Sequence, residues 1–133
     1  MNKLLFVLLS LFFVCQASLA AEESPEEGLN EIISLYKSKN FDILIKERYT
    51  EIYKAKNDKE VESLIMLFSK KMENVKRYKQ TIALLESIDL TNIEISKNPS
   101  PQLTETKKMA VFRLKNGTYK LYLQKNGKWG FHL

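Results

Sequence analysis

His132 is the only histidine of this 133-residue chain, and histidine is the residue type best suited to acid–base or anion-binding chemistry near neutral pH. It stands next to last in the sequence, with no adjacent acid and no second histidine that could complete a metal site. The carboxylates gather near Glu22, Glu26 and Asp58, where they suit flexible or helix-starting segments more than a paired acid–base site. We therefore expect His132 to be exposed and non-catalytic, and we expect no metal and no cofactor.

Sequence motifs that accompany the common enzyme chemistries do not occur in the chain. It has no G-x-S-x-G, no H-E-x-x-H and no glycine-rich phosphate loop, and it contains only four glycines. Cys15 is the only cysteine, and it falls in a segment that we expect to be removed. The remaining chain would then have neither a thiol nucleophile nor a thiolate metal ligand. An enzyme is accordingly not the favoured interpretation.

Residues 1–20 have the composition of a secretory signal peptide. Lys3 precedes an apolar run from Leu4 to Val14, and small residues lead to a cleavage site after Ala20. The run is shorter than the roughly 20 residues of a membrane span. An uncleaved anchor and a lipid-modified Cys15 are the alternatives. We expect a periplasmic or secreted protein with one α+β domain, residues 21–133, that meets the membrane only through the signal peptide.

The charge of the chain is unevenly distributed along the sequence. Its net charge is +5, but residues 21–96 contain 12 Lys and Arg against 15 Asp and Glu. Residues 97–133 contain 8 against 1. This asymmetry indicates either an anionic partner or two parts of one domain that attract each other. Because exported proteins rarely encounter nucleic acid as a substrate, we expect no nucleic-acid partner.

Apolar residues follow a helical period through most of the chain before residue 90. Ser24, Pro25 and Glu27 have the spacing of an N-cap, a first helical residue and a capping box. The segment from Tyr78 fits a helical face better than an alternating strand, although a strand is the alternative. Four helices are predicted. The first starts at Ser24, the second runs from Phe41 to about Ala55, the third has Asp58 as its cap, and the fourth runs from Tyr78 to Ile88.

Period-two alternation replaces the helical period after a loop that contains Pro99 and Pro101. It predicts strands at Met109–Leu114, Tyr119–Leu123 and Trp129–Leu133, with a shorter one earlier, around Ile93 and Ile95. The expected fold is therefore α+β, with three to four N-terminal helices packed on a curved antiparallel sheet of three to four strands that ends in a meander.

The tripeptide Lys-Asn-Gly occurs twice between the last three strands, at residues 115–117 and 125–127. Asn-Gly is typical of a two-residue type I′ hairpin, which at the first copy pairs Lys115 with Thr118 and Leu114 with Tyr119. At the second copy, we predict a three-residue loop in which Gly127 has a left-handed conformation. This loop pairs Leu123 with Trp129 and keeps the large apolar residues on one face. This register gives one apolar face: Ala110, Phe112, Leu114, Tyr119, Leu121, Leu123, Trp129, Phe131 and Leu133.

Two candidate binding surfaces follow from these elements. On the outer face of the sheet, Arg113, Lys120, Tyr122 and His132 could bind an anion or a protein partner, or could form an ordinary solvated face. A homodimer could also form through this sheet. On the helical side, aromatic residues either fill the core or line a cavity for a small apolar ligand. That candidate pocket comprises Tyr36, Tyr49, Tyr53, Phe68 and Trp129.

Two segments carry a resemblance to a known superfamily: "IISLYKSKNFDILIKERYTE" and the terminal "LYLQKNGKWGF". With this order of helices and strands, the chain resembles the nuclear-transport-factor-2-like superfamily, in particular its small exported bacterial domains. The resemblance implies a sheet curled around a long helix, with a pocket at the open end. Some members are isomerases, cyclases or dehydratases with an Asp/His or Tyr/Asp set, but Asp42, Asp89 and His132 do not form such a set in the predicted fold. Other members bind small ligands, dimerise or act as immunity proteins.

The favoured function is therefore that of an exported, non-enzymatic binding domain for a small apolar ligand or a protein partner. The alternative is an inhibitor or immunity-type module that uses the basic sheet face. A small isomerase or hydratase is the least favoured interpretation.

Overall fold

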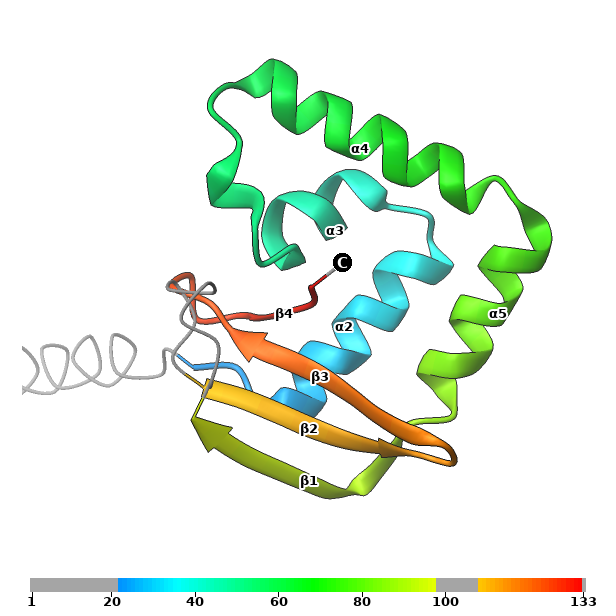
Figure 1. Cartoon of the computed structure of the whole chain (residues 1–133), viewed down its shortest axis with the longest axis vertical. Coiled ribbons are helices and arrows are strands. Elements are labelled where there is room, and N and C mark those ends of the chain that lie inside the picture. Colours follow the sequence, from blue (N-terminus) through cyan, green and yellow to red (C-terminus); the bar gives the residue numbers. More distant parts are fainter. Residues whose placement is uncertain (1–21, 98–107, 133) are drawn as a thin grey trace, which may run out of the picture.

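The computed structural model describes residues 22–97 and 108–132, in which helices precede an antiparallel sheet as predicted (Figure 1). The sheet order is β1-β2-β3-β4, and each neighbouring pair is antiparallel. The predicted signal peptide and the loop with Pro99 and Pro101 lie outside the described residues. The elements are α2 (Pro25–Lys37), α3 (Phe41–Arg48), the 3-10 helix η1 (Ile52–Lys54), α4 (Asp58–Met72), α5 (Val75–Glu86), β1 (Asp89–Lys97), β2 (Lys108–Leu114), β3 (Gly117–Leu123) and β4 (Trp129–Gly130).

Helix α2 begins at the capping box that the sequence indicates. The Ser24 hydroxyl accepts from the Glu27 amide at 3.1 Å, and the Glu27 carboxylate accepts from the Ser24 amide at 3.2 Å. The predicted cap of α4 is one residue too late, because Asn57 and not Asp58 occupies that position. The Asn57 side chain accepts from the Glu60 amide at 2.9 Å, which satisfies one free amide of the first turn.

Helix α3 ends at Arg48, whereas the periodicity predicts a helix to about Ala55. The cause is a pairing between segments distant in sequence, in which Tyr49 forms an isolated parallel bridge with Phe131. The Phe131 amide donates to the Arg48 carbonyl at 2.7 Å, and the Thr50 amide donates to the Phe131 carbonyl at 3.0 Å. These bonds hold Tyr49 extended at the end of α3 and leave only η1 of the expected helix.

The first Lys-Asn-Gly turn differs from the prediction in its pairing. Leu114 pairs with Gly117 and Phe112 with Tyr119, so Lys115 and Asn116 form the turn. Neither turn residue has a positive φ, which a type I′ turn requires at both positions; Gly117 follows the turn with φ 134°. The pairing is displaced by two residues, and the assignment of side chains to faces is therefore unchanged.

The second Lys-Asn-Gly turn confirms the prediction. Leu123 pairs with Trp129, and Gly127 has φ 78°. The Gln124 amide donates to the Lys128 carbonyl at 3.0 Å, and the Gly127 amide donates to the Gln124 carbonyl at 3.1 Å. The ladder ends at Gly130, earlier than predicted, because Phe131 turns to the strand-like residues after α3.

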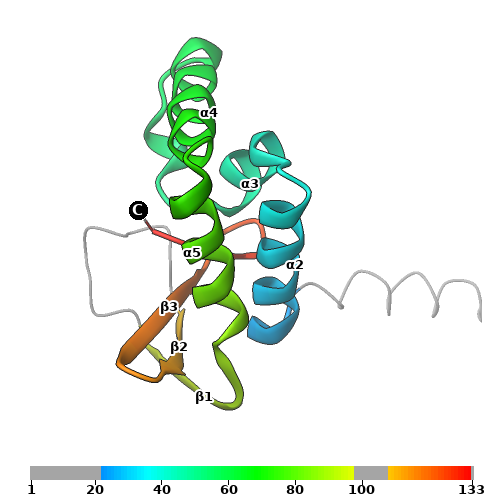
Figure 2. The ribbon, with the colours of Figure 1, turned by 90° about the vertical axis from the view of Figure 1, so that its right-hand side faces the viewer.

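Helices α2 and α5 lie beside the apolar face of the sheet, and α4 lies at the far end of the molecule (Figure 2). The predicted helix at Tyr78–Ile88 is confirmed as α5. One cluster of buried side chains connects these elements, and it takes residues from four helices and from β2 to β4. Its largest fully buried side chains are Leu29, Ile32, Leu44, Ile45, Phe112 and Leu121.

Candidate functional site

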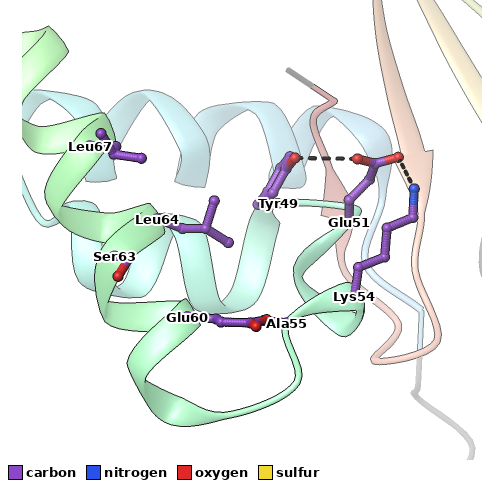
Figure 3. Close-up of a pocket in the computed structure, with 8 residues that line it drawn as sticks. All are labelled: Tyr49, Glu51, Lys54, Ala55, Glu60, Ser63, Leu64 and Leu67. Atoms are coloured by element: carbon purple, nitrogen blue, oxygen red, sulfur yellow. Dashed lines mark hydrogen bonds and ion pairs between the residues drawn. The ribbon is translucent and has the colours of Figure 1, made fainter.

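A pocket of about 350 Å³ lies between α4 and the segment that follows α3 (Figure 3). Leu64 projects toward Tyr49 across it, and Leu67 lies one turn further along α4. Ala55 closes the side formed by the end of η1. The full lining is Tyr49, Glu51, Lys54, Ala55, Glu60, Ser63, Leu64 and Leu67.

The early end of α3 creates this pocket. Because residues 48–50 pair with the C-terminal segment, the chain from Tyr49 to Ala55 leaves the helical path and faces α4 as a separate wall. The Glu60 carboxylate then accepts from the Lys56 amide at 2.7 Å and fixes the chain where it enters α4. The wall after α3 is thus held by a backbone pairing at one end and by a side chain–backbone bond at the other.

Three polar side chains form the rim on the η1 side. The Lys54 ammonium donates to the Glu51 carboxylate at 2.6 Å, and the Tyr49 hydroxyl donates to the other Glu51 oxygen at 3.4 Å. The Lys54 hydrogen bond is the largest influence on the pKa of Glu51 and holds it below its usual range. Burial, followed by the charge of Glu51, raises the pKa of Tyr49 above its usual value.

His132 lies close to this rim, on its sheet side. Its Nδ1 is 3.4 Å from the Thr50 hydroxyl and 4.0 Å from a Glu51 carboxylate oxygen. The expectation that no acid lies near His132 is therefore wrong, because the bridge between Tyr49 and Phe131 brings the chain end beside Glu51. His132 is exposed, as expected, but it does not line the pocket.

The aromatic residues predicted to line one pocket are divided between the core and two surface cavities. Tyr36, Phe68 and Trp129 are buried, and ring centroids of Tyr36 and Phe68 are 5.8 Å apart. Burial raises the pKa of Tyr36 to about 12. Tyr49 lines the pocket of Figure 3, and Tyr53, which is 44% exposed, lines a separate cavity of about 180 Å³ beside the second turn.

The predicted basic surface keeps three of its four members on the outer sheet face. Arg113 pairs with Thr118 in the ladder, and Thr118, Lys120 and Tyr122 alternate along β3 on that side. Arg113 and Lys120 are exposed, and Arg113 lines a cavity of about 220 Å³. His132 follows β4 and contacts the Thr50–Glu51 segment instead.

An ion pair that the sequence analysis missed anchors the start of the described chain. Arg48 is only 2% exposed, and its guanidinium donates to the two Glu23 carboxylate oxygens at 2.5 and 2.8 Å. The Trp129 amide donates to the same carboxylate at 3.1 Å, and its indole N–H donates to the Glu23 carbonyl at 2.8 Å. The position of Glu23 in the sequence indicated a flexible acidic segment, and these contacts show that this interpretation is wrong for Glu23.

Arg48 and Glu23 hold parts of the pocket wall in place and do not themselves contact the pocket. Arg48 also donates to the Trp129 carbonyl at 3.1 Å, one residue before the Gly130–Phe131 segment that pairs with residues 48–50. Burial raises the pKa of Glu23, but the bonds from Arg48 and the Trp129 amide outweigh it and bring the pKa below its usual range. The pair is thus an ionised support for the pocket.

Among residues 22–97 and 108–132, no group of three His, Cys, Asp or Glu side chains could hold a metal ion. Within the same ranges, none of the helices has the length and apolar character needed to cross a membrane. Comparison with protein-family models, with curated proteins and with solved structures found no match to this chain.

Proposed function

We propose that the protein is an exported, non-enzymatic binding domain that takes a small, mostly apolar ligand in the pocket between Tyr49 and Leu67. The observation that carries the proposal is the combination of apolar walls with a polar rim in one preformed concavity of about 350 Å³. This volume lies at the lower end of the range of about 300–1,000 Å³ that is typical of ligand pockets. The ligand is accordingly small.

The chemistry of the lining defines the class of ligand. Leu64, Leu67 and Ala55 offer apolar surface, so burial of hydrocarbon supplies the main favourable free energy. Glu51 and Lys54 are paired with each other, and the Glu60 carboxylate, which accepts from the Lys56 amide, leaves the lining with one net negative charge that disfavours an anionic ligand. The Ser63 and Tyr49 hydroxyls can orient a single polar group at the rim. A ligand with an apolar body and one neutral polar group fits this lining.

The pKa shifts at the rim favour binding over acid–base catalysis. The pKa of Glu51 is lowered, chiefly by the Lys54 hydrogen bond, and this makes its carboxylate a weaker base. The pKa of Tyr49 is raised, chiefly by burial, and this makes its hydroxyl a weaker acid at neutral pH. Both shifts move these groups away from the pKa near 7 that suits proton transfer.

Export and membership of the nuclear-transport-factor-2-like superfamily are parts of the same proposal. Export is supported by the charge, apolar run and small residues of the first twenty positions. The superfamily is supported by the order of helices before an antiparallel meander. The alternative function is a protein-binding inhibitor or immunity-type module, and it is supported by the exposed Arg113 and Lys120 on the outer sheet face.

Native mass spectrometry of the protein purified from its own host tests the proposal. We expect a bound small molecule on the wild-type protein and its loss in Ala55→Phe, because a phenyl ring added at residue 55 occupies the pocket. Ala83→Phe is the matched control, since Ala83 is exposed on α5 outside the pocket lining. A wild-type protein without bound mass, or one whose bound mass persists in Ala55→Phe, contradicts the proposal.

A further inference from the structure

Helix α4 turns one side toward the molecule and exposes the other. Of its residues only Phe68 is fully buried, while Met66 is 65% exposed. Both views place α4 at the rim of the molecule, with α3 and α5 toward its inner side (Figures 1 and 2). No other described element covers the outer side, so this face is available to a partner.

The outer side of α4 carries a symmetric pattern of charge around Met66. Glu62 precedes Met66 by four residues and Lys70 follows it by four; Lys59 precedes it by seven and Glu73 follows it by seven. Steps of three and four residues place these five side chains on one stripe, which we name the Met66 stripe. Glu73, the C-cap, keeps a right-handed helical conformation and so continues the stripe.

The charged residues of the Met66 stripe are not used within the described part of the chain. All four are exposed, and none forms a salt bridge with another described residue. The neighbouring helices do pair their charges, as Lys37 with Glu86 and Lys46 with Asp42. The stripe therefore offers four unpaired charges around one exposed apolar side chain.

We propose that a second copy of the chain binds the Met66 stripe, with the two α4 helices antiparallel about a two-fold axis at Met66. This symmetry brings Met66 against Met66 of the second copy. It also places Glu62 opposite Lys70 and Lys59 opposite Glu73, twice each. A self-complementary surface of this kind is what a two-fold dimer requires, since the same patch must fit itself.

The charge order selects this arrangement over a parallel one. A parallel pair in register sets each charge beside a copy of itself, which is repulsive. The antiparallel pair also opposes the two helix dipoles, with the basic Lys70–Lys71 end of one helix beside the acidic Asp58–Glu62 end of the other. Because Met66 is the only apolar residue of the stripe, the dimer is small, reversible and weakened by salt.

Sedimentation equilibrium of the full chain over a concentration series tests the dimer. Glu62→Lys and Lys70→Glu each replace two attractive contacts by two repulsive ones, and we expect each to raise the dimer dissociation constant about tenfold or more. The double variant Glu62→Lys/Lys70→Glu exchanges the charges and restores the pairing, so it should dimerise like the wild type. Association through residues 1–20 is common to all variants, so the difference in dissociation constant between variants reports on the α4 contact.

Mixing the two single variants provides a stronger test. Glu62→Lys presents only Lys at positions 62 and 70, and Lys70→Glu presents only Glu, so an equal mixture should form a heterodimer. Lys79→Glu on α5 is the control for the change in net charge and should leave wild-type dimerisation unchanged. A monomeric wild type, a double variant that is not restored, or a mixture that stays monomeric overturns the proposal. If the wild-type protein is monomeric and α4 instead binds an unrelated protein, the proposal is contradicted in the same way.

Discussion

Arg48 is a charged side chain almost without solvent contact, and Glu23 supplies its opposite charge. Breaking a buried pair by removing one partner leaves an uncompensated charge, which typically costs about 3–5 kcal/mol. We therefore expect Glu23→Ala to lower the free energy of unfolding by an amount in that range. The double variant Glu23→Leu/Arg48→Met should recover part of the loss, because both charges are then absent while the Trp129 amide and carbonyl lose their partners. Urea unfolding monitored by Trp129, the only tryptophan, measures all three proteins.

The pH dependence of this pair has a defined direction. Burial raises the pKa of Glu23, but the Arg48 and Trp129 bonds outweigh burial, so folding lowers this pKa. The contribution of Glu23 to the free energy of unfolding is therefore fully present above the ordinary carboxyl pKa. The contribution is lost as the pH falls through the lowered, folded-state pKa. Glu23→Gln removes this group from the titration, so its stability should fall less steeply with acid than that of the wild type. Equal slopes for the two proteins would contradict the role assigned to Glu23.

The sequence could not reveal this pair, since Glu23 and Arg48 are 25 residues apart and lie in segments with ordinary local explanations. Glu23 belongs to an acidic run before a helix, and Arg48 resembles a basic residue in the last turn of one. Ser24 and Glu27, by contrast, were predictable, because both partners of a capping box lie within four residues.

At the scale of elements, the two Lys-Asn-Gly turns place different demands on their glycines. Gly127 has φ 78°, close to the left-handed region that asparagine tolerates, whereas Gly117 has φ 134°, which residues with a Cβ rarely adopt. We expect Gly117→Asn to destabilise the protein by about 1–3 kcal/mol and Gly127→Asn by less. Thermal unfolding of both variants checks the order, and a larger loss at Gly127 would contradict it.

Local patterns predicted the elements and the buried face of the sheet, but not where pairing begins and ends. Alternation assigns Phe112 and Leu121 to the apolar faces of their strands, and the three-residue loop at the second turn adds Trp129; all three are buried. The first register was missed because the tripeptide does not state which two of its residues form the turn; Lys115 and Asn116 form it, and Gly117 already pairs with Leu114. The early end of α3 was missed because a bond to Phe131, 83 residues after Arg48, outweighs the helical period.

For the whole molecule, the opposite charges of its two sequence parts meet across the fold. Lys128 lies 2.6 Å from Glu47, and Lys108 lies 3.7 Å from Glu22. These contacts favour the interpretation of the asymmetry as attraction within one domain. The charges on the Met66 stripe do not belong to this attraction between the two sequence parts, because the stripe lies wholly within residues 21–96 and carries both signs of charge.

The candidate pocket was only partly predictable. Tyr49 was predicted as a pocket residue because its ring is apolar and its hydroxyl can supply a polar group, and it does line the cavity. The other walls depend on the chain leaving the helical path after Arg48, and no periodicity in the sequence signals that change. The position of Ala55 and Leu67 in the pocket lining therefore follows from the parallel bridge between Tyr49 and Phe131, which the sequence does not indicate.

Fluorescence titration with the neutral probe N-phenyl-1-naphthylamine tests ligand binding at the pocket most directly. The adjacent residues Leu67 and Met66 form a matched pair, since both are exposed on α4 but only Leu67 lines the pocket. We predict saturable binding that weakens about tenfold in Leu67→Asn, as expected for the loss of about 1.4 kcal/mol of apolar contact, and that is unchanged in Met66→Asn. Absence of saturable binding, or equal effects of the two substitutions, would contradict the account.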